Sequence, residues 1–371
     1  MSKNEFSAVP GSTTLADIAG RANVSVATVS FILNNTPGRR FAEKTRRKVI
    51  EIANELKYSP NISARNLKTQ SGSMISVAVR ELQYMKDPYF AEFMSGLVFR
   101  AAESGYSIHI CSTIPNKIGT GRPGGRKGIY YKDYIQGGFS AGLIINDLVM
   151  PEDEVRELVE TGFPVVLFDK VVDGCSSVIV DYDSAIRTVI NRLVRQGHRR
   201  IVGIFPEPVV GYNKRVINVF EKSIRDAGID VSESYVKTVG PIGDDPIVDG
   251  DKVRDVVNSL MLDGEPPTVV LVTSRRVRTY LTSHLKTLKI AVPRDISVFG
   301  GMEIEFLKDE GDKISCFRLD EAKCGELAVD LLLKQINVQH DRRGSSRKLS
   351  SISVDLDIIW RESTAFLNKP E

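Results

Sequence analysis

The chain has 371 residues, 42% of them hydrophobic and 26% charged, so it is long enough to form more than one globular domain. It contains no run of about 18 apolar residues, which excludes a predicted membrane span. The N-terminal residues lack the basic start and apolar stretch of an export signal, so we expect a cytoplasmic protein.

The net charge of +3 is unevenly distributed along the chain. Residues 1–70 contain 11 basic and 5 acidic side chains, which gives +6, whereas the remaining 39 basic and 42 acidic side chains give −3. A basic head on a mildly acidic body is typical of a nucleic-acid-binding module joined to another domain, although a solvated basic surface gives the same count. Four scattered cysteines without a CxxC pair predict reduced, buried thiols and neither a metal nor a cofactor.

The first predicted elements are two short helices joined by a tight turn. Thr14 and Asp17 have the spacing of a capping box, and the apolar positions of residues 15–22 recur with helical period. Asn23 can adopt the left-handed conformation that ends this helix, and Ser25 can cap a second helix that runs through Leu33. The three-residue turn between them predicts a helix-turn-helix.

The second predicted helix carries an aromatic residue on its outer face. Val26, Val29, Ile32 and Leu33 form the expected buried stripe, whereas Phe31 points outward with Ala27 and Asn34. Either this helix is buried on both sides or its outer face meets a partner. A third helix is predicted from about Ala42 to Leu56, and three such helices can close a small core.

The next segment, YSPNISARNLKT, is predicted to be a hinge rather than an independent domain. Pro60 disfavours helix at Ser59, and residues 61–68 have too little apolar surface to fold alone. Contact with DNA could order the segment, with Arg65 near phosphates and Leu67 as an apolar wedge in the minor groove; a plain linker is the alternative.

Beyond residue 73 the chain alternates buried strands with amphipathic helices, which predicts parallel sheets covered by helices. The alternation forms two layers of similar length, with a change in the pattern near Val171–Cys175, which suggests two lobes with a cleft between them. Ligands in such folds sit beyond the carboxyl ends of the strands. The predicted strands are 74–81, 106–113, 141–147, 164–170, 199–205, 235–240, 268–274 and 296–301.

Several longer motifs resemble the lactose/galactose repressor (LacI/GalR) family of bacterial transcriptional regulators. They are TLADIAGRANVSVATVSFILNN, TRRKVIEIANELKYSPN, SARNLKT, DPYFAEFMSGLVFRAAESGY, RLVRQGHRRI, VPRDISVFGG and WREST. The resemblance implies an all-α helix-turn-helix headpiece with a hinge helix, followed by an α/β two-lobed body with parallel sheets, similar to periplasmic binding proteins. It implies domains at 1–59, 60–72 and 73–371, with lobes at 73–171 plus 316–344 and at 172–315 plus 345–371.

The resemblance assigns base-edge contacts to Val26 and Ala27 and minor-groove contacts to Ala64 and Leu67. Phe31 departs from the family, which usually has an arginine there, so we expect an operator without the guanine preference that arginine imposes. The predicted DNA-binding residues are Thr14, Ser25, Val26, Ala27, Thr28, Ser30, Phe31, Asn34, Asn61, Ala64, Arg65 and Leu67.

Strand ends and matched motif positions together predict an effector site between the lobes. Ser274-Arg275 replaces an Asn-Asp pair of many family members, and Gly301-Met302 replaces an aromatic residue followed by Asp, which leaves the ligand open. The predicted effector residues are Tyr89, Phe90, Asp147, Asp169, Arg215, Ser274, Arg275 and Met302.

The leading hypothesis is a transcriptional repressor that binds a palindromic operator as a homodimer and responds to a sugar, a nucleoside or an anionic metabolite. A solute-binding receptor without a DNA role and a repressor controlled by a protein partner stay open as alternatives. An enzyme is not expected, because the four histidines are dispersed and no paired acids stand out.

Overall fold

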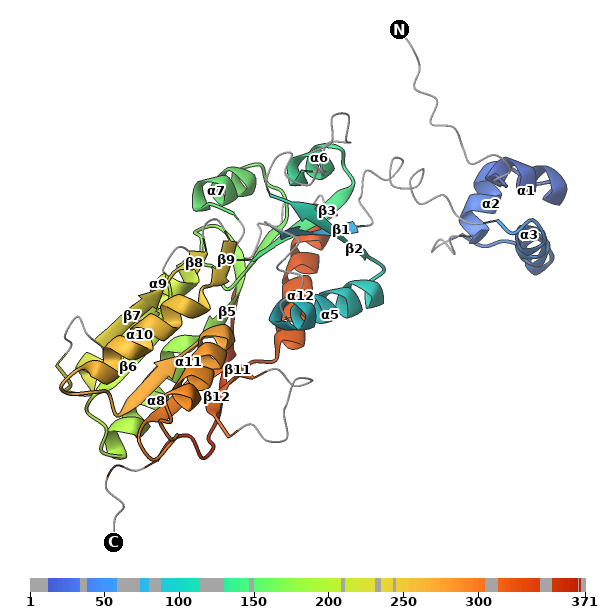
Figure 1. The fold of residues 1–371 in the computed structure, drawn as a ribbon. Coiled ribbons are helices and arrows are strands. Elements are labelled where there is room, and N and C mark those ends of the chain that lie inside the picture. Colours follow the sequence, from blue (N-terminus) through green and yellow to red (C-terminus); the bar gives the residue numbers. More distant parts are fainter. Residues whose placement is uncertain are drawn as a thin grey trace, which may run out of the picture. The chain divides into compact units, whose positions relative to one another are not determined.

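The chain divides into two compact units, residues 1–70 and residues 71–371, each with its own core (Figure 1). The structure is a computed structural model. It describes residues 13–33, 39–58, 74–79, 88–113, 130–146, 150–207, 211–230, 235–242, 245–303, 313–340, 349–365 and 367.

The first unit contains the three predicted helices, α1 (Leu15–Ala22), α2 (Val26–Leu33) and α3 (Glu43–Glu55). The capping box is confirmed: the Asp17 carboxylate accepts a hydrogen bond from the Thr14 N–H at 2.8 Å, and the Thr14 hydroxyl accepts one from the Asp17 N–H at 3.3 Å. Asn23 ends α1 in the left-handed region with φ 58°. The helix-turn-helix with a third closing helix is therefore confirmed.

The buried stripe of α2 is shorter than expected. Val29 and Ile32 lie in the core of the unit with Ile18 and Val49, but Val26 is 47% exposed. Val26 occupies the first turn of α2, and Val24 in the preceding turn packs on the core instead. The prediction that Val26 is buried is therefore wrong, and its side chain is free to meet a partner.

The second unit contains two six-stranded sheets and a small hairpin. In the first sheet every neighbouring pair is parallel. Its strands, in spatial order, are β13 (Ser351–Asp355), β5 (Ser176–Asp181), β4 (Val165–Phe168), β3 (Ser140–Asn146), β1 (Met74–Val79) and β2 (Ser107–Ser112).

The second sheet is parallel except for one edge strand, β14, which runs antiparallel to β12. Its strands, in spatial order, are β14 (Asp357–Ile359), β12 (Ser315–Arg318), β11 (Ser297–Glu303), β10 (Val269–Val272), β6 (Ile201–Pro206) and β7 (Val236–Val239). The hairpin pairs β8 (Pro241–Ile242) with β9 (Asp245–Val248). The α/β body with parallel sheets is confirmed.

Helices alternate with the strands in both lobes. Helices α5 and α12 lie side by side against the first sheet, where a Cβ at Gly96 would lie 1.8 Å from the Ala322 carbonyl oxygen (Figure 1). The body helices are α5 (Pro88–Glu103), α6 (Tyr131–Gln136), α7 (Glu152–Glu160), α8 (Tyr182–Arg195), α9 (Gly211–Asp226), α10 (Gly250–Leu262), α11 (Arg275–Thr287) and α12 (Glu321–His340).

The chain crosses between the lobes three times, at positions that differ from those implied by the resemblance. Because β5 pairs with β4, residues 176–181 belong to the first sheet, and the first crossing follows Asp181 rather than residue 172. The second follows β12, which ends at Arg318, a few residues beyond the expected 315. Because β13 pairs with β5, the last crossing lies at Leu356 rather than near 345.

Two further findings concern the described ranges alone. None of their helices is long and apolar enough to cross a membrane. All four cysteines are buried free thiols, as expected, and burial raises the pKa of Cys111 and of Cys324 to about 12.

Candidate nucleic-acid interface and ligand site

Hydroxyl side chains cap the first two helices of the headpiece. The Ser25 hydroxyl accepts a hydrogen bond from the Thr28 N–H at 3.1 Å, and the Ser25 and Thr28 hydroxyls lie 2.9 Å apart. At α1, hydrogen bonds from the Thr14 hydroxyl and N–H lower the pKa of Asp17. These caps leave the positive ends of two helices at the surface, an arrangement that suits contact with phosphate groups.

Helix α2 contains most of the described residues that were predicted to bind DNA. Val26 and Ala27 are exposed, whereas Thr28, Ser30 and Phe31 are half-buried. The structure thus brings seven predicted residues together at the start of α1 and along α2. The other five predicted residues lie outside the described ranges; they are Asn34, Asn61, Ala64, Arg65 and Leu67.

Phe31 has a neighbour that the sequence analysis missed. The Arg39 guanidinium carbon lies 5.1 Å from the centroid of the Phe31 ring, within the range of a cation–π contact. Arg39 follows α2 by six residues, so helical periodicity gives no signal for this contact. The outer aromatic residue is therefore covered by a charged side chain of its own unit.

In the body, two predicted effector residues from different lobes form an ion pair. Asp169 follows β4 in the left-handed region with φ 55° and is 6% exposed. Its carboxylate accepts hydrogen bonds from the Val180 N–H at 3.3 Å and from the Arg215 guanidinium. Because Arg215 belongs to α9 of the second lobe, this pair of a buried carboxylate and a half-buried guanidinium links the two lobes.

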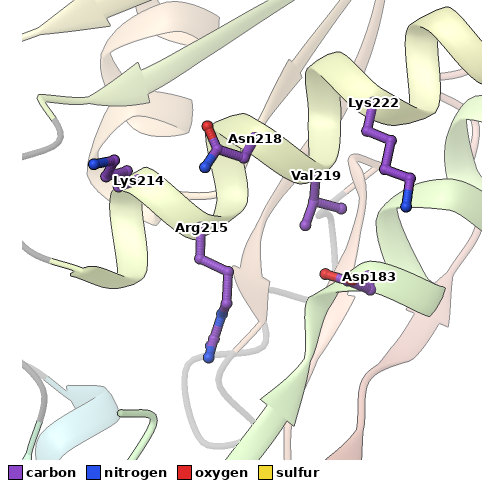
Figure 2. Close-up of a pocket in the computed structure, with 6 residues that line it drawn as sticks. All are labelled: Asp183, Lys214, Arg215, Asn218, Val219 and Lys222. Atoms are coloured by element: carbon purple, nitrogen blue, oxygen red, sulfur yellow. The ribbon is translucent and has the colours of Figure 1, made fainter. Parts of the chain in front are cut away.

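Arg215 also borders an open hollow of about 440 Å³ on the second lobe. Figure 2 shows Arg215 and Lys222 extending on the same side of α9, with Lys222 directed toward the start of α8, where Asp183 lies. No carboxylate forms an ion pair with Lys214 or Lys222 within the described ranges. The hollow is lined by Asp183, Lys214, Arg215, Asn218, Val219 and Lys222.

The other described effector candidates contact neighbouring parts of the body. Phe90 and Met302 are buried in the hydrophobic core at 6% and 9% exposure, and Tyr89 packs against Phe168. Ser274 caps α11 by accepting a hydrogen bond from the Val277 N–H at 3.4 Å, and Arg275 begins that helix. Their contact with a ligand stays a prediction, and Asp147 lies outside the described residues.

A second buried ion pair follows the departure at Gly301-Met302. Glu303 is 5% exposed and pairs with Arg361, which also donates to the Ile314 carbonyl oxygen at 2.9 Å and to the Cys316 sulfur at 3.1 Å. A carboxylate thus lies at the end of β11, but it already forms an ion pair with Arg361. Sequence reasoning missed this pair, since its members are 58 residues apart.

Models of two protein families match the chain. One, described as bacterial regulatory proteins of the lacI family, matches residues 14–61, and the other, described as a periplasmic binding protein-like domain, matches residues 190–364. The first therefore covers the helix-turn-helix, and the second covers most of the second lobe together with α12 and the last strands.

Individual relatives are similar over most of their length. Catabolite control protein A of Priestia megaterium is 26% identical over 77% of this chain and 81% of that protein. The HTH-type transcriptional repressor PurR of Vibrio vulnificus (strain CMCP6) is 25% identical over 89% and 94%, respectively. A solved lac repressor dimer, bound to operator and an anti-inducer, shares the fold with TM-score 0.75 at 21% identity, covering 95% of this chain and 99% of that one.

These relatives are regulators of transcription, which confirms the expectation of a regulator rather than an enzyme. The helix-turn-helix, the two-lobed body and both family models agree: the chain joins a helix-turn-helix domain of the lacI family of bacterial regulatory proteins to a periplasmic binding protein-like domain.

Proposed function

We propose that this regulator is a repressor that binds a palindromic DNA operator as a homodimer and responds to a small anionic metabolite. The observation that carries the proposal is the outward side of α2, where Val26 and Ala27 are exposed on a helix whose other side closes the headpiece core. In a helix-turn-helix the second helix enters the major groove, and its exposed side chains meet base edges. Since its operator is chromosomal DNA, we expect the protein in the cytoplasm.

The second copy needs a surface on the body, and α5 offers one. The exposed residues of α5 include an uncharged stripe at helical spacing, in which Val98 is 49% and Phe99 is 59% exposed. A solvated helix face normally carries charges. We assign this stripe to the homodimer contact; its residues are Ala91, Ser95, Val98, Phe99 and Ala102.

The cations along α9 favour an anionic effector among the three ligand classes that the sequence left open. Lys214 and Lys222 are exposed, and Asn218 lies between them on the same stripe of the helix. A phosphate or carboxylate group in the hollow gains charge-assisted hydrogen bonds from these side chains. It also competes with Asp169 for Arg215, and this competition weakens the link between the lobes.

Such competition couples the ligand to the operator. A coupling free energy of about 1–3 kcal/mol between the two sites changes operator affinity by roughly 5- to 150-fold. The ligand and the operator then bias the same two arrangements of the body, and each alters the affinity for the other.

Selection of bound sequences from random DNA by the purified protein tests the first part of the proposal. We expect a palindrome with two half-sites whose centres are one helical turn apart, or a multiple of it. If only unrelated sequences are recovered at moderate salt, the proposed binding to a palindromic operator is wrong.

A thermal-shift panel of neutral sugars, nucleosides and sugar phosphates tests the effector. We expect stabilisation by a sugar phosphate, and loss of that stabilisation in the double variant Lys214→Ala/Lys222→Ala. The double variant Lys286→Ala/Lys289→Ala is the matched control, since both of these lysines are exposed on the same lobe. Stabilisation by a neutral sugar that survives both double variants would contradict an anionic effector.

A further inference from the structure

We propose that Arg39, held against the ring of Phe31, is a specificity-determining residue that selects guanine in each half of the operator. The proposal rests on the proposed operator binding and deepens it. It also replaces the expectation that phenylalanine at position 31 deprives the operator of a guanine preference.

The geometry places a guanidinium on the outward side of the recognition helix. Phe31 lies one turn beyond the exposed Ala27 on α2, and the Arg39 guanidinium carbon is 5.1 Å from the centre of its ring. Phe31 is only half-buried and does not belong to the core cluster that contains Val29 and Ile32. Its ring therefore serves as a platform at the surface.

The chemistry of arginine suits such a platform. A guanidinium that packs with its face on an aromatic ring keeps its N–H donors at the edge of its plane, where they can form two parallel hydrogen bonds. The contact also restricts a long side chain before DNA arrives, which lowers the entropic cost of ordering it on binding.

Arg39 forms no ion pair with the described residues of its unit. Its side chain is exposed, and among the described residues no carboxylate lies within ion-pair distance of it. By contrast, Arg21 pairs with Glu55, and Arg47 pairs with Glu43. Arg39 therefore keeps its hydrogen-bond donors for a ligand.

A base edge is a better match than a phosphate for this arginine. Val26, Ala27 and Phe31 have no side-chain donors, and the hydroxyls of Ser25, Thr28 and Ser30 offer one donor each. Among the described residues of α2, no side chain therefore offers two parallel donors to guanine O6 and N7. A guanidinium fork fits these two acceptors, and α2 is the helix that enters the major groove. Arg39 supplies from the following segment the donors that the helix itself does not carry.

The test is selection of bound sequences from random DNA by the full-length protein and by four variants. Arg39→Ala removes the donors, Arg39→Lys keeps the charge but not the fork, and Phe31→Leu keeps apolar bulk but removes the ring. Arg40→Ala is the matched control, because Arg40 is the exposed neighbour of Arg39 without the ring contact.

We expect the wild-type protein and Arg40→Ala to select the same palindrome, with a guanine at one symmetric pair of positions. Arg39→Ala and Phe31→Leu should lose that guanine preference by about tenfold or more, and Arg39→Lys should lose part of it, while their remaining positions stay the same. Arg39→Ala changes an exposed side chain, so its folding is not at risk.

Two results would overturn the proposal and leave operator binding intact. One is an unchanged sequence preference in Arg39→Ala. The other is a uniform loss of affinity in Arg39→Ala on all sequences, with the salt dependence reduced by about one phosphate contact, which would make Arg39 a phosphate ligand. If the wild-type protein selects no palindrome, operator binding itself is wrong and this inference falls with it.

Discussion

At the scale of single residues, His198 shows how burial fixes a protonation state. It is 1% exposed; its Nε2 lies 3.1 Å from the Ala365 carbonyl oxygen, and its Nδ1 lies 2.9 Å from the Thr268 hydroxyl. The neutral ring donates from Nε2 to the Ala365 carbonyl oxygen. Its Nδ1 faces the Thr268 hydroxyl, which also lies 3.2 Å from the Arg200 carbonyl oxygen and can donate to it. Burial lowers the pKa of His198, and it also lowers that of His109 on β2.

This burial predicts a body that loses stability in mild acid. Because the folded-state pKa lies below the unfolded value of 6.5, the unfolded chain binds protons first as the pH falls. The free energy of unfolding should therefore be constant above about pH 7.5 and should decrease from about pH 6.5 downward, through the lowered pKa. Urea titrations at pH 7.5 and 5.5 measure the difference.

The variant His198→Gln should show a smaller difference in free energy of unfolding between pH 7.5 and pH 5.5. Protonation of His109 should account for part of the difference that this variant retains. An equal loss of stability between pH 7.5 and 5.5 in the wild-type protein and in His198→Gln would contradict the role given to His198.

Residue contacts also show where sequence reasoning stops. Asp169 and Arg215 were each predicted as ligand contacts, but not their mutual ion pair, since 46 residues and a change of lobe separate them. The contact of Arg39 with Phe31 is missed for a similar reason, because periodicity describes one helix and Arg39 lies beyond its end. The capping box at Thr14 was predicted correctly, since it depends only on residues within one turn.

At the scale of elements, the eight strands read from apolar runs are all present, and most of them are buried on both faces, which leaves a continuous signal. Six further described strands were missed, namely β5, β8, β9, β12, β13 and β14. For example, β5 begins with two serines, and β13 alternates exposed and half-buried residues at the sheet edge. Which sheet a strand joins depends on long-range pairing, so the lobe boundaries near 172 and 345 were misplaced.

The contact of α5 with α12 predicts a strong effect of one methyl group. In Gly96→Ala the new Cβ would meet the Ala322 carbonyl oxygen, and no flexible side chain stands there to move aside. We expect the free energy of unfolding of the body to fall by about 1–3 kcal/mol or more, measured by urea denaturation. Gly264→Ala is the control, since a Cβ at that position meets nothing within 4 Å; equal stability of the two variants would contradict this packing.

At the scale of the whole molecule, the exposed apolar stripe of α5 bears on assembly. Phe99 is the largest exposed side chain of that stripe, and Arg100 beside it is already paired with Asp330 at 2.6 Å. An apolar stripe bordered by paired charges is typical of a surface that is covered in the working protein.

Phe99→Asp should therefore weaken self-association. Burial of a phenylalanine contributes about 1.5–3 kcal/mol, so we expect the dissociation constant of the dimer to rise by roughly 10- to 150-fold, measured by sedimentation equilibrium. Leu262→Asp serves as the control, because Leu262 is 86% exposed at the end of α10. Dissociation by Leu262→Asp but not by Phe99→Asp would move the dimer contact to another face.

The three lobe crossings have a consequence for synthesis of the protein on the ribosome. The described headpiece is complete once residue 58 has emerged, whereas the first lobe waits for α12 and β13 and the second waits for β14. The sheets of both lobes are therefore complete only after Ser351–Ile359 have emerged from the ribosome, long after the headpiece can fold. A chain truncated by a premature stop codon in the body before Ser351 would carry the three headpiece helices on a body in which neither sheet has all of its strands.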